Sequence, residues 1–514
     1  MRKVLLLTIG AFLCNYGFSQ LVDDVAKNAW FVPYGTARSV SVGGAIGALG
    51  GDITSSSVNP AGLGFYKTSE VVFSPSFLMN NNKSDYRGSA LDNIKKSTFQ
   101  LGTTGVVFGG KMSRPDRSAA FSISLNQLAS YNNKISYSGL NDYSSYSEQY
   151  LEQLVADNAS VQSASNDYPF GSSLAFFTYL IDSISSPSGG LLGYRSLVPV
   201  GDGNSVQQQY DETTGGGLYE VSFGFASNHS DKLLLGASIN VPLSFYTQDI
   251  SYTETDPTGN TNNDFAYSTF TQKHTLNGYG INARLGLIYR PEQSLRLGLA
   301  IHTPSFMSYT DKLKAAITTD TEDYAGVQTS KSSDFDNAVE RTQYNEITPY
   351  KIVASAAYVF REVENVKLQK GFITADIEYV NHRGSRFLQQ ADDDGYYSDD
   401  LNDYYKSLND IIKSYYKGAF NFRLGGEIKF SPYSIRLGGA YYGSPYDDKQ
   451  LKANRIMAAG GLGYRNHGFF IDLAIAQTFN KDVSFPYRLS DKANTYASLK
   501  NNRLNVLLTA GFKF

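Results

Sequence analysis

Cysteine is nearly absent from this chain of 514 residues, since its only cysteine is Cys14 near the N-terminus. If that segment is removed, the mature chain has no disulfide and no thiolate metal site. The net charge is −3, so there is no basic excess and nucleic acid is not an expected partner. No apolar stretch reaches the length of about 20 residues that a transmembrane helix needs. The chain must gain its stability in another way.

The N-terminus has the pattern of a secretory signal peptide. Arg2 and Lys3 are followed by an apolar run of ten residues, Val4–Leu13, and then by the small residues of Gly17–Ser19. We expect residues 1–19 to be a cleaved signal for Sec-type export, with cleavage near Gln20. The run is too short to serve as an uncleaved anchor, because a spanning helix takes about 20 residues. Leu13 before Cys14 is not small, which argues against a lipoprotein.

Aromatic residues, glycine and alternation of apolar with polar residues dominate the rest of the chain. There are 38 Tyr, 31 Phe and 47 Gly, the residues that form interfacial girdles and relieve crowding in a curved sheet. In the last segment, Leu504–Phe514, every second residue is apolar and the series ends in an aromatic. This pattern resembles the signal that barrel-assembly machinery recognises in outer-membrane proteins. The alternative is a soluble amphipathic edge strand.

The same period of two recurs in enough segments to predict an all-β fold, a 14-stranded antiparallel transmembrane β-barrel. An even number places both chain ends in the periplasm. The expected strands are Val71–Phe77, Phe99–Phe108, Ala119–Gln127, Leu218–Ala226, Leu233–Phe245, Ile281–Tyr289, Leu295–Met307, Ile352–Phe360, Phe372–Tyr379, Phe420–Phe430, Ser434–Tyr442, Arg455–Tyr464, Phe469–Gln477 and Arg503–Phe514.

Four strands repeat the phrase Arg-Leu-Gly, which puts Arg and Gly on one face and Leu on the other. A charge on the lipid side of a barrel costs about 2–4 kcal/mol at the membrane midplane, so the arginines are expected inside. Carboxylates are expected inside by the same argument, and the charges either fix the register of the barrel or meet a ligand. The arginines are Arg284, Arg296, Arg423 and Arg436, and the carboxylates are Glu220, Asp376, Glu378, Glu427 and Asp472.

Three long insertions break the alternation, near residues 131–216, 310–342 and 383–417. The first contains an expected helix, Ser147–Ala156, and the third contains apolar residues at helical spacing. Barrels of this type have short periplasmic turns and long extracellular loops, so we expect helical loops outside the cell.

The stretch Gly35–Gly64 consists mainly of small residues and contains an Asn-Pro-Ala-Gly turn signal. Glycines and alanines allow a backbone to pack closely against surrounding walls. A phosphate-binding loop is excluded because no G-x-G-x-x-G or G-K-[ST] follows a strand. The residues that carry this pattern are Gly43, Gly44, Ala45, Asn59, Pro60, Ala61, Gly62 and Leu63.

This stretch resembles the N-terminal hatch of the FadL/TodX outer-membrane transporters of long-chain fatty acids and hydrocarbons. The resemblance is close over Gly35–Gly64, although Gly50-Gly51-Asp52 stands where the family has paired acidic residues. It implies a hatch at residues 20–68, a barrel at residues 69–514, and passive transport of a hydrophobic compound that leaves sideways into the bilayer. The signal peptide and the high tyrosine content suggest a Bacteroidota source.

Two groups of residues are candidates for ligand contact. An inward arginine could bind a ligand carboxylate with two hydrogen bonds. An apolar loop stretch, Leu174–Ile184, could line an outer groove or pack against its own loop. Separately, Pro304 could mark a kink in the barrel wall or the end of a strand. The candidates are Leu174, Phe176, Phe177, Leu180, Arg284, Arg296, Arg423 and Arg436.

Other functions were weighed against transport. Large polar loops would also suit a partner-binding barrel such as a shuttle or docking component of a type IX secretion system. None of the five histidines lies in a recognisable catalytic motif. No sequence motif supports haem binding through His274 or His302. We therefore expect no enzyme activity, no cofactor and no metal. The expected partners are a hydrophobic small molecule, outer-membrane lipid and the assembly machinery, with the protein itself a monomer.

Overall fold

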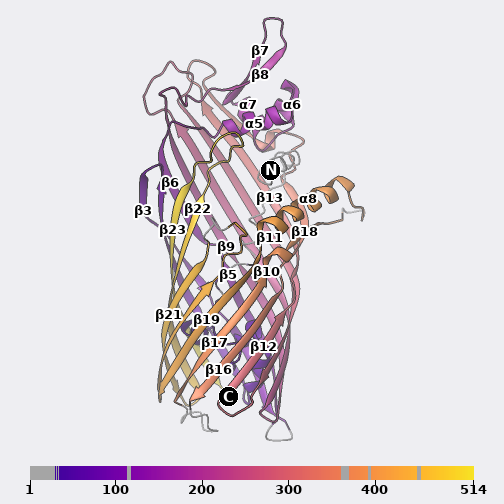
Figure 1. Cartoon of the computed structure of the whole chain (residues 1–514), viewed down its shortest axis with the longest axis vertical. Coiled ribbons are helices and arrows are strands. Elements are labelled where there is room, and N and C mark those ends of the chain that lie inside the picture. Colours follow the sequence, from indigo (N-terminus) through magenta and orange to yellow (C-terminus); the bar gives the residue numbers. More distant parts are fainter. Residues whose placement is uncertain are drawn as a thin grey trace.

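The computed structural model describes residues 29, 32, 34–112, 117–360, 370–391, 395–448 and 453–514. The expected signal peptide, residues 1–19 with Cys14, lies outside the described residues. The described chain forms a tall antiparallel barrel that carries helices and hairpins at one end (Figure 1). No helix within these ranges is long and apolar enough to cross a membrane.

The first half of the barrel wall contains three strands that are each divided into two segments, followed by three long undivided ones. These are β1 (Glu70–Phe73) with β2 (Pro75–Tyr86), β3 (Ser89–Leu101) with β4 (Thr104–Lys111), β5 (Ser118–Ser130) with β6 (Asn133–Asn141), β9 (Val206–His229), β10 (Leu233–Thr255) and β11 (Tyr267–Tyr289).

The second half contains three more divided strands and then five undivided ones. These are β12 (Leu295–His302) with β13 (Phe306–Asp320), β15 (Arg341–Ile347) with β16 (Lys351–Phe360), β17 (Gly371–Asn381) with β18 (Arg386–Gln389), β19 (Gly418–Phe430), β20 (Tyr433–Tyr442), β21 (Arg455–Asn466), β22 (Phe469–Ser484) and β23 (Ala497–Lys513).

These segments make fourteen wall strands, and the barrel closes where the last strand, β23, pairs with β1 and β2. The predicted 14-stranded antiparallel barrel is confirmed, and each of the fourteen predicted ranges falls on one wall strand. Several strands extend well beyond their predicted ends. For example, β9 begins at Val206, whereas its predicted start was Leu218. The insertion predicted at 131–216 therefore begins with β6 and ends with the upper half of β9. Water lies on one or both sides of the wall there, so apolar alternation is weak.

The lower wall presents leucine outward and arginine inward, as predicted. Leu285 is 60% exposed while the preceding Arg284 is 6% exposed, and Leu437 is 70% exposed beside Arg436 at 1%. Exposed apolar side chains form a belt around this part of the barrel, which is the surface that a lipid bilayer covers. The interior is polar and charged.

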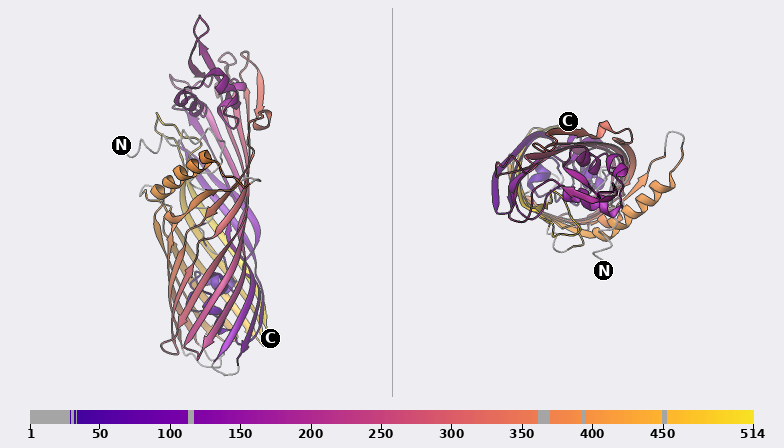
Figure 2. Two further views of the ribbon diagram at one scale, coloured as in Figure 1. Left: turned by 90° about the vertical axis from the view of Figure 1, so that its right-hand side faces the viewer. Right: turned by 90° about the horizontal axis from the view of Figure 1, so that it is seen from above.

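The N-terminal residues 34–66, here called the plug, lie inside the lower barrel (Figure 2). The plug contains α3 (Ala37–Ser41), α4 (Ser55–Val58) and the 3-10 helix η2 (Pro60–Phe65). Most of its residues are buried. Short helices and turns suit this segment because its small side chains let the backbone approach the wall from inside.

The other end of the barrel carries the extracellular cap, which we define as the helices and hairpins above the wall. It has a core of tyrosine and aliphatic side chains that includes Tyr137, Tyr150, Tyr210 and Tyr252. The expected helix at Ser147–Ala156 is present, with Ser147 as its N-cap residue. The elements are α5 (Glu148–Ala156), α6 (Val161–Asn166), α7 (Ser172–Phe177), β7 (Ile181–Ser185), β8 (Leu191–Ser196), β14 (Val327–Lys331) and η3 (Ser332–Asp334).

The third insertion folds as α8 (Asp399–Tyr415), which lies against the side of the barrel below the cap (Figure 1). Its apolar residues Leu408 and Ile412 are fully buried with Tyr344 and Phe387 in a second aromatic cluster. Helical spacing in the sequence therefore predicted this element correctly.

Candidate functional site

The glycines of the Arg-Leu-Gly phrases are the places where the wall contacts the plug. A Cβ atom added at Gly438 would lie 2.2 Å from the carbonyl carbon of Val42, and one at Gly425 would lie 2.2 Å from the Val42 oxygen. Gly298 contacts Gly47 in the same way, and Gly286 contacts Asn59. Only glycine leaves room for the plug backbone at these positions, so the repeated phrase marks the height of the plug.

The arginines of the same phrases are held by carboxylates or by the plug. Arg284 donates two hydrogen bonds to Glu220, at 2.6 and 2.7 Å. Arg423 pairs with Glu378 at 2.8 Å. These pairs are buried, and the planar guanidinium makes them directional.

The other two arginines lie near the turns at the end of the barrel opposite the cap, close to the start of β12 and of β20. Arg436 contacts Glu427 and Asp472, each at 2.6 Å. Arg296 donates to the Leu49 carbonyl, and its guanidinium lies 4.2 Å from the centre of the Phe65 ring. Arg296 therefore joins the wall to the plug, while Arg436 joins its strand β20 to Glu427 on β19 and Asp472 on β22.

Polar side chains tie the plug to itself. The Thr36 hydroxyl donates to Asp52 at 2.7 Å, and the Thr54 amide donates to the same carboxylate at 2.9 Å. Asn59 accepts from the Ala61 amide at 3.2 Å, which caps η2, while its side-chain nitrogen donates to Gly47 at 2.6 Å. The Asn-Pro turn signal of the sequence is thus a helix cap that joins two parts of the plug.

The residues named from the hatch pattern all lie in the plug. Gly43 and Gly44 have φ of 72° and 76°, a backbone region that favours glycine. Gly44 is half-buried at a cavity described below, and the others are fully buried. The buried ones are Gly43, Ala45, Asn59, Pro60, Ala61, Gly62 and Leu63.

The wall separates at one position, here called the lateral split. Segment β4 pairs with β5. Above this pair, β3 pairs with β2 and β6 pairs with β9, but among the described residues β3 and β6 do not pair with each other. At the lower end of the split, the Thr103 amide donates to the carbonyl of Gly35 at 3.1 Å. A backbone donor of the wall is therefore used by the plug.

Side chains bridge the lateral split instead of backbone bonds. The Thr103 hydroxyl donates to Asn126 at 3.0 Å, and Gln100 donates to Ser130. Higher up, the Asn82 amide donates to Asn133 at 2.7 Å. Bonds of this kind can open by rotation of side chains, whereas a β-ladder must break several coupled bonds.

Pro304 lies at a second interruption, here called the Pro304 break, between β12 and β13. The Thr303 amide still donates to Ala283 at 3.0 Å, and Ser305 exchanges bonds with Thr348 at 2.8 and 3.0 Å. Both neighbouring strands therefore stay joined across the interruption. Of the two interpretations, a kink in the wall or a strand end, Pro304 fits the strand end, because β12 ends at His302 and β13 begins at Phe306.

A cavity of about 90 Å³ lies between the plug and the wall. One part of its lining is apolar and includes Val58, Leu128, Leu218 and Met307. Leu128 is the bulged residue of β5 beside the lateral split. The charged part of the lining consists of Glu220, Arg284, Lys351, Glu378 and Arg423.

The predicted outer-groove residues lie in the cap. Leu174 and Leu180 are fully buried in its core, and Phe176 packs against that core. Phe177 is half exposed and contacts the ring of Phe335 edge-on. Leu174 and Leu180 thus fit the alternative interpretation, in which this stretch packs within its own loop.

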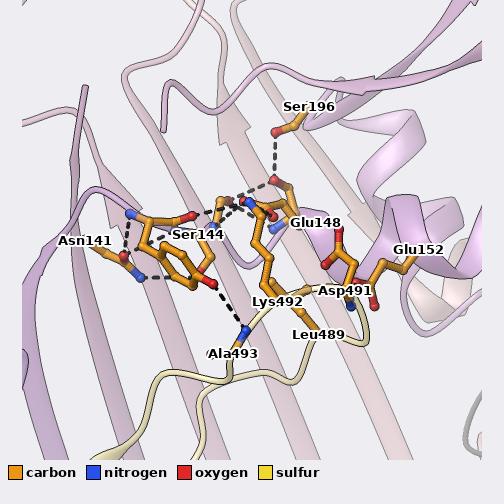
Figure 3. A network of polar contacts seen from close by, with 12 residues as sticks. Asn141, Ser144, Glu148, Glu152, Ser196, Leu489, Asp491, Lys492 and Ala493 are labelled. Carbon is orange, nitrogen blue, oxygen red and sulfur yellow. Dashed lines mark hydrogen bonds and ion pairs between the residues drawn. The ribbon is translucent and has the colours of Figure 1, made fainter. Parts of the chain in front are cut away.

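The cap is closed by polar contacts between α5 and residues 485–496 (Figure 3). Glu148 pairs with Lys492 at 2.6 Å, and Glu152 accepts from the amides of Ser490 and Asp491 at 2.8 and 3.1 Å. Burial, together with the side-chain carboxyl of Asp491, raises the pKa of Glu152 against the smaller opposite effect of the two backbone amides. These contacts connect α5 with the segment that joins β22 to β23.

The two histidines considered for haem have partners in the structure. His274 lies 2.8 Å from Asp311, and His302 lies 2.8 Å from the carbonyl of Val58 in the plug. Across the described ranges there is no group of three or more His, Cys, Asp or Glu residues that could hold a metal ion.

The barrel was compared with known proteins. No protein-family model matches the chain, and no curated protein matches it in sequence. The crystal structure of a Pseudomonas aeruginosa FadL homologue is similar with a TM-score of 0.53 at 12% identity, covering 95% of this chain and 100% of that one. A deltaS2 mutant of the TodX monoaromatic hydrocarbon channel gives 0.50 at 13% identity, covering 93% and 98%. At such identities the likeness shows that the fold is shared.

Proposed function

We propose that this protein is an outer-membrane channel for passive uptake of long-chain fatty acids or similar amphiphilic hydrophobic compounds, and that the cargo leaves through the lateral split. One observation carries the proposal: the cavity above the plug reaches Leu128 at the split, where the Thr103 amide is bonded to Gly35 of the plug. The TodX channel and the FadL homologue share this fold, which supports a hydrophobic cargo.

The lining of the cavity suits a molecule with a long tail and one acidic head group. The apolar side accepts methylenes, each of which gains roughly 0.8 kcal/mol when it leaves water. On the charged side, three cations face two carboxylates, so one negative charge would balance the lining. A carboxylate head is a good match for this excess because guanidinium and ammonium groups bind carboxylates strongly.

The plug and the split are coupled through shared hydrogen bonds. When the plug moves, Gly35 no longer accepts from Thr103, and the lower end of the split loses a backbone bond. The side-chain bridges at Gln100 and Asn82 then remain as the barrier. Lateral release keeps the tail away from water, because the cargo passes from an apolar cavity directly into the bilayer.

Uptake of labelled oleate by a strain that lacks its own fatty-acid channel tests the proposal. The native chain should restore uptake, and Met307→Trp should abolish most of it by filling the cavity. Met79→Trp is the matched control because Met79 lies on the outer face of β2. Purified protein should bind a fluorescent fatty acid with the same ranking.

Wild-type uptake without the protein, together with no binding by the purified chain, would contradict the proposal. Purification in gentle detergent gives a second readout. A stable protein partner with no bound lipid would favour the partner-docking role instead.

A further inference from the structure

A cluster of cations lies on the outer face of the wall above the apolar belt. It spans β11, β13, β14 and β15, and all five side chains are exposed. Here it is called the basic hollow. Its members are Lys273, Lys312, Lys314, Lys331 and Arg341.

The register of the strands places like charges directly beside one another. Lys273 is opposite Lys314 on one side and Asp249 on the other, and Lys312 is opposite Arg341. Like charges at such positions destabilise a sheet unless an anion lies between them. Within the described part of the chain, Lys314 alone of the five forms an ion pair, with Glu340 at 3.5 Å.

The surface at this cluster is concave. A hollow of about 450 Å³ is lined by Lys273, Lys314 and Lys331 together with Ser332 and Ser333. Asp249, Thr271 and Glu340 complete the polar rim. Ammonium groups beside hydroxyls and carboxylates can bind both the phosphates and the hydroxyls of a sugar phosphate.

The height of the hollow decides which lipid can reach it. Lys273 lies six residues above Tyr279 on β11, and Lys312 lies six residues above Phe306 on β13; both aromatic residues are exposed in the belt. At the rise and tilt of barrel strands this is about 15 Å above the belt. A phospholipid head group reaches only about 5–8 Å from the hydrocarbon.

We infer that the basic hollow binds the phosphorylated oligosaccharide of a glycolipid in the outer leaflet. Such a head group extends far enough above the bilayer and carries the negative charge that the five cations lack. The glycolipid would anchor the tall side of the barrel. The site depends on the barrel lying in an outer membrane, but not on transport.

Native mass spectrometry of the full-length barrel with a purified short-core lipopolysaccharide tests the inference. Lys273→Gln/Lys314→Gln should weaken binding about tenfold or more. Lys273→Arg/Lys314→Arg should retain it, because the charges remain. Lys406→Gln/Lys413→Gln removes the same charge from α8, where each lysine is paired with an aspartate, and should change binding less than about twofold.

Two further probes identify the chemistry. Chemically dephosphorylated lipopolysaccharide should bind the native chain as weakly as the intact lipid binds the glutamine variant. Inorganic phosphate at the same concentration should not displace the lipid. Equal loss in the α8 control, unchanged binding of the dephosphorylated lipid, or displacement by inorganic phosphate would overturn the inference.

Discussion

The barrel wall is interrupted at two places that differ in how their backbone groups are satisfied. At the Pro304 break, Ser305 and Thr348 exchange hydrogen bonds and the neighbouring strands stay joined. At the lateral split, the Thr103 amide bonds to the plug and β3 leaves its neighbour. A proline is therefore not what opens this wall. The wall opens where the plug takes over one of its donors.

This difference matters because the cavity touches both interruptions. Thr303, Ser305 and Thr348 line it on one side and Leu128 lines it on the other. The cavity lies beside both interruptions, and only the one at Leu128 lacks strand pairing and is bridged by side chains and by the bond from Thr103 to the plug. The following predictions test that distinction.

The largest expected effect comes from locking the lateral split. Gln100 and Ser130 contact each other across it through the end of the glutamine side chain, so Gln100→Cys/Ser130→Cys can be joined by a short thiol crosslinker that contains a reducible disulfide. Oleate uptake should fall at least about tenfold when the pair is crosslinked and recover on reduction, because the exit would be covalently closed. The only native cysteine, Cys14, lies within the expected signal peptide, so the background is low.

The matched control is Ser305→Cys/Thr348→Cys at the Pro304 break. These strands are already joined, so the crosslink should leave uptake within about twofold of the native rate. If this pair blocks uptake and the first does not, the two interruptions have been assigned the wrong roles.

Displacing the plug should have the next largest effect. Gly438→Ala places a Cβ atom against Val42 and should destabilise the plug by about 1–3 kcal/mol. Gly460→Ala is the control, since its Cβ would lie 3.4 Å from Leu437. Limited proteolysis of the N-terminal segment should be faster in the first variant alone. Equal protection in both would show that the wall glycines do not position the plug.

Removing the coupling bond should have a smaller effect. Thr103→Pro deletes the amide that donates to Gly35. We expect oleate uptake to change about twofold to fivefold while the melting temperature stays within a few degrees of the native value. Unchanged uptake kinetics would show that the plug and the split move independently.

The smallest effect concerns the cap, which lies above both interruptions. The folded-state pKa of Glu152 is raised, so its contribution to stability is fully present below the unfolded pKa and is lost as pH rises through the folded value. The protection of residues 485–496 from hydrogen exchange, after correction for the intrinsic pH dependence of the exchange rate, should therefore be greater near pH 4 than near pH 7. Glu152→Gln should remove this difference, and a difference that persists would exclude Glu152 as its source.

Much of the lower barrel could be predicted from the sequence. Its strands face lipid on one side, so apolar alternation is strong there, and the cost of a charge in lipid placed Arg284 and Arg436 inside. The Arg-Leu-Gly phrase was visible, but the role of Gly438 was not, because the plug residue it contacts, Val42, is almost four hundred positions away.

The upper barrel and the lateral split could not be predicted in the same way. The upper halves of β9 and β10 meet water, so their pattern is weak. Thr103 carries no local signal, because its partner, Gly35, is defined only by the closure of the barrel around the plug. Pro304 gave a stronger local signal of an interruption, yet the strands on both sides stay joined there through Thr303 and Ser305.

Photocrosslinking with a diazirine analogue of a long-chain fatty acid tests the central claim most directly. In membranes containing the native barrel, the account predicts labelled peptides that contain Leu128 and Leu218 and the outer face of β3 near Phe99. Labelling confined to residues 303–305 and 348–350, or to the extracellular cap alone, would contradict lateral release at the split.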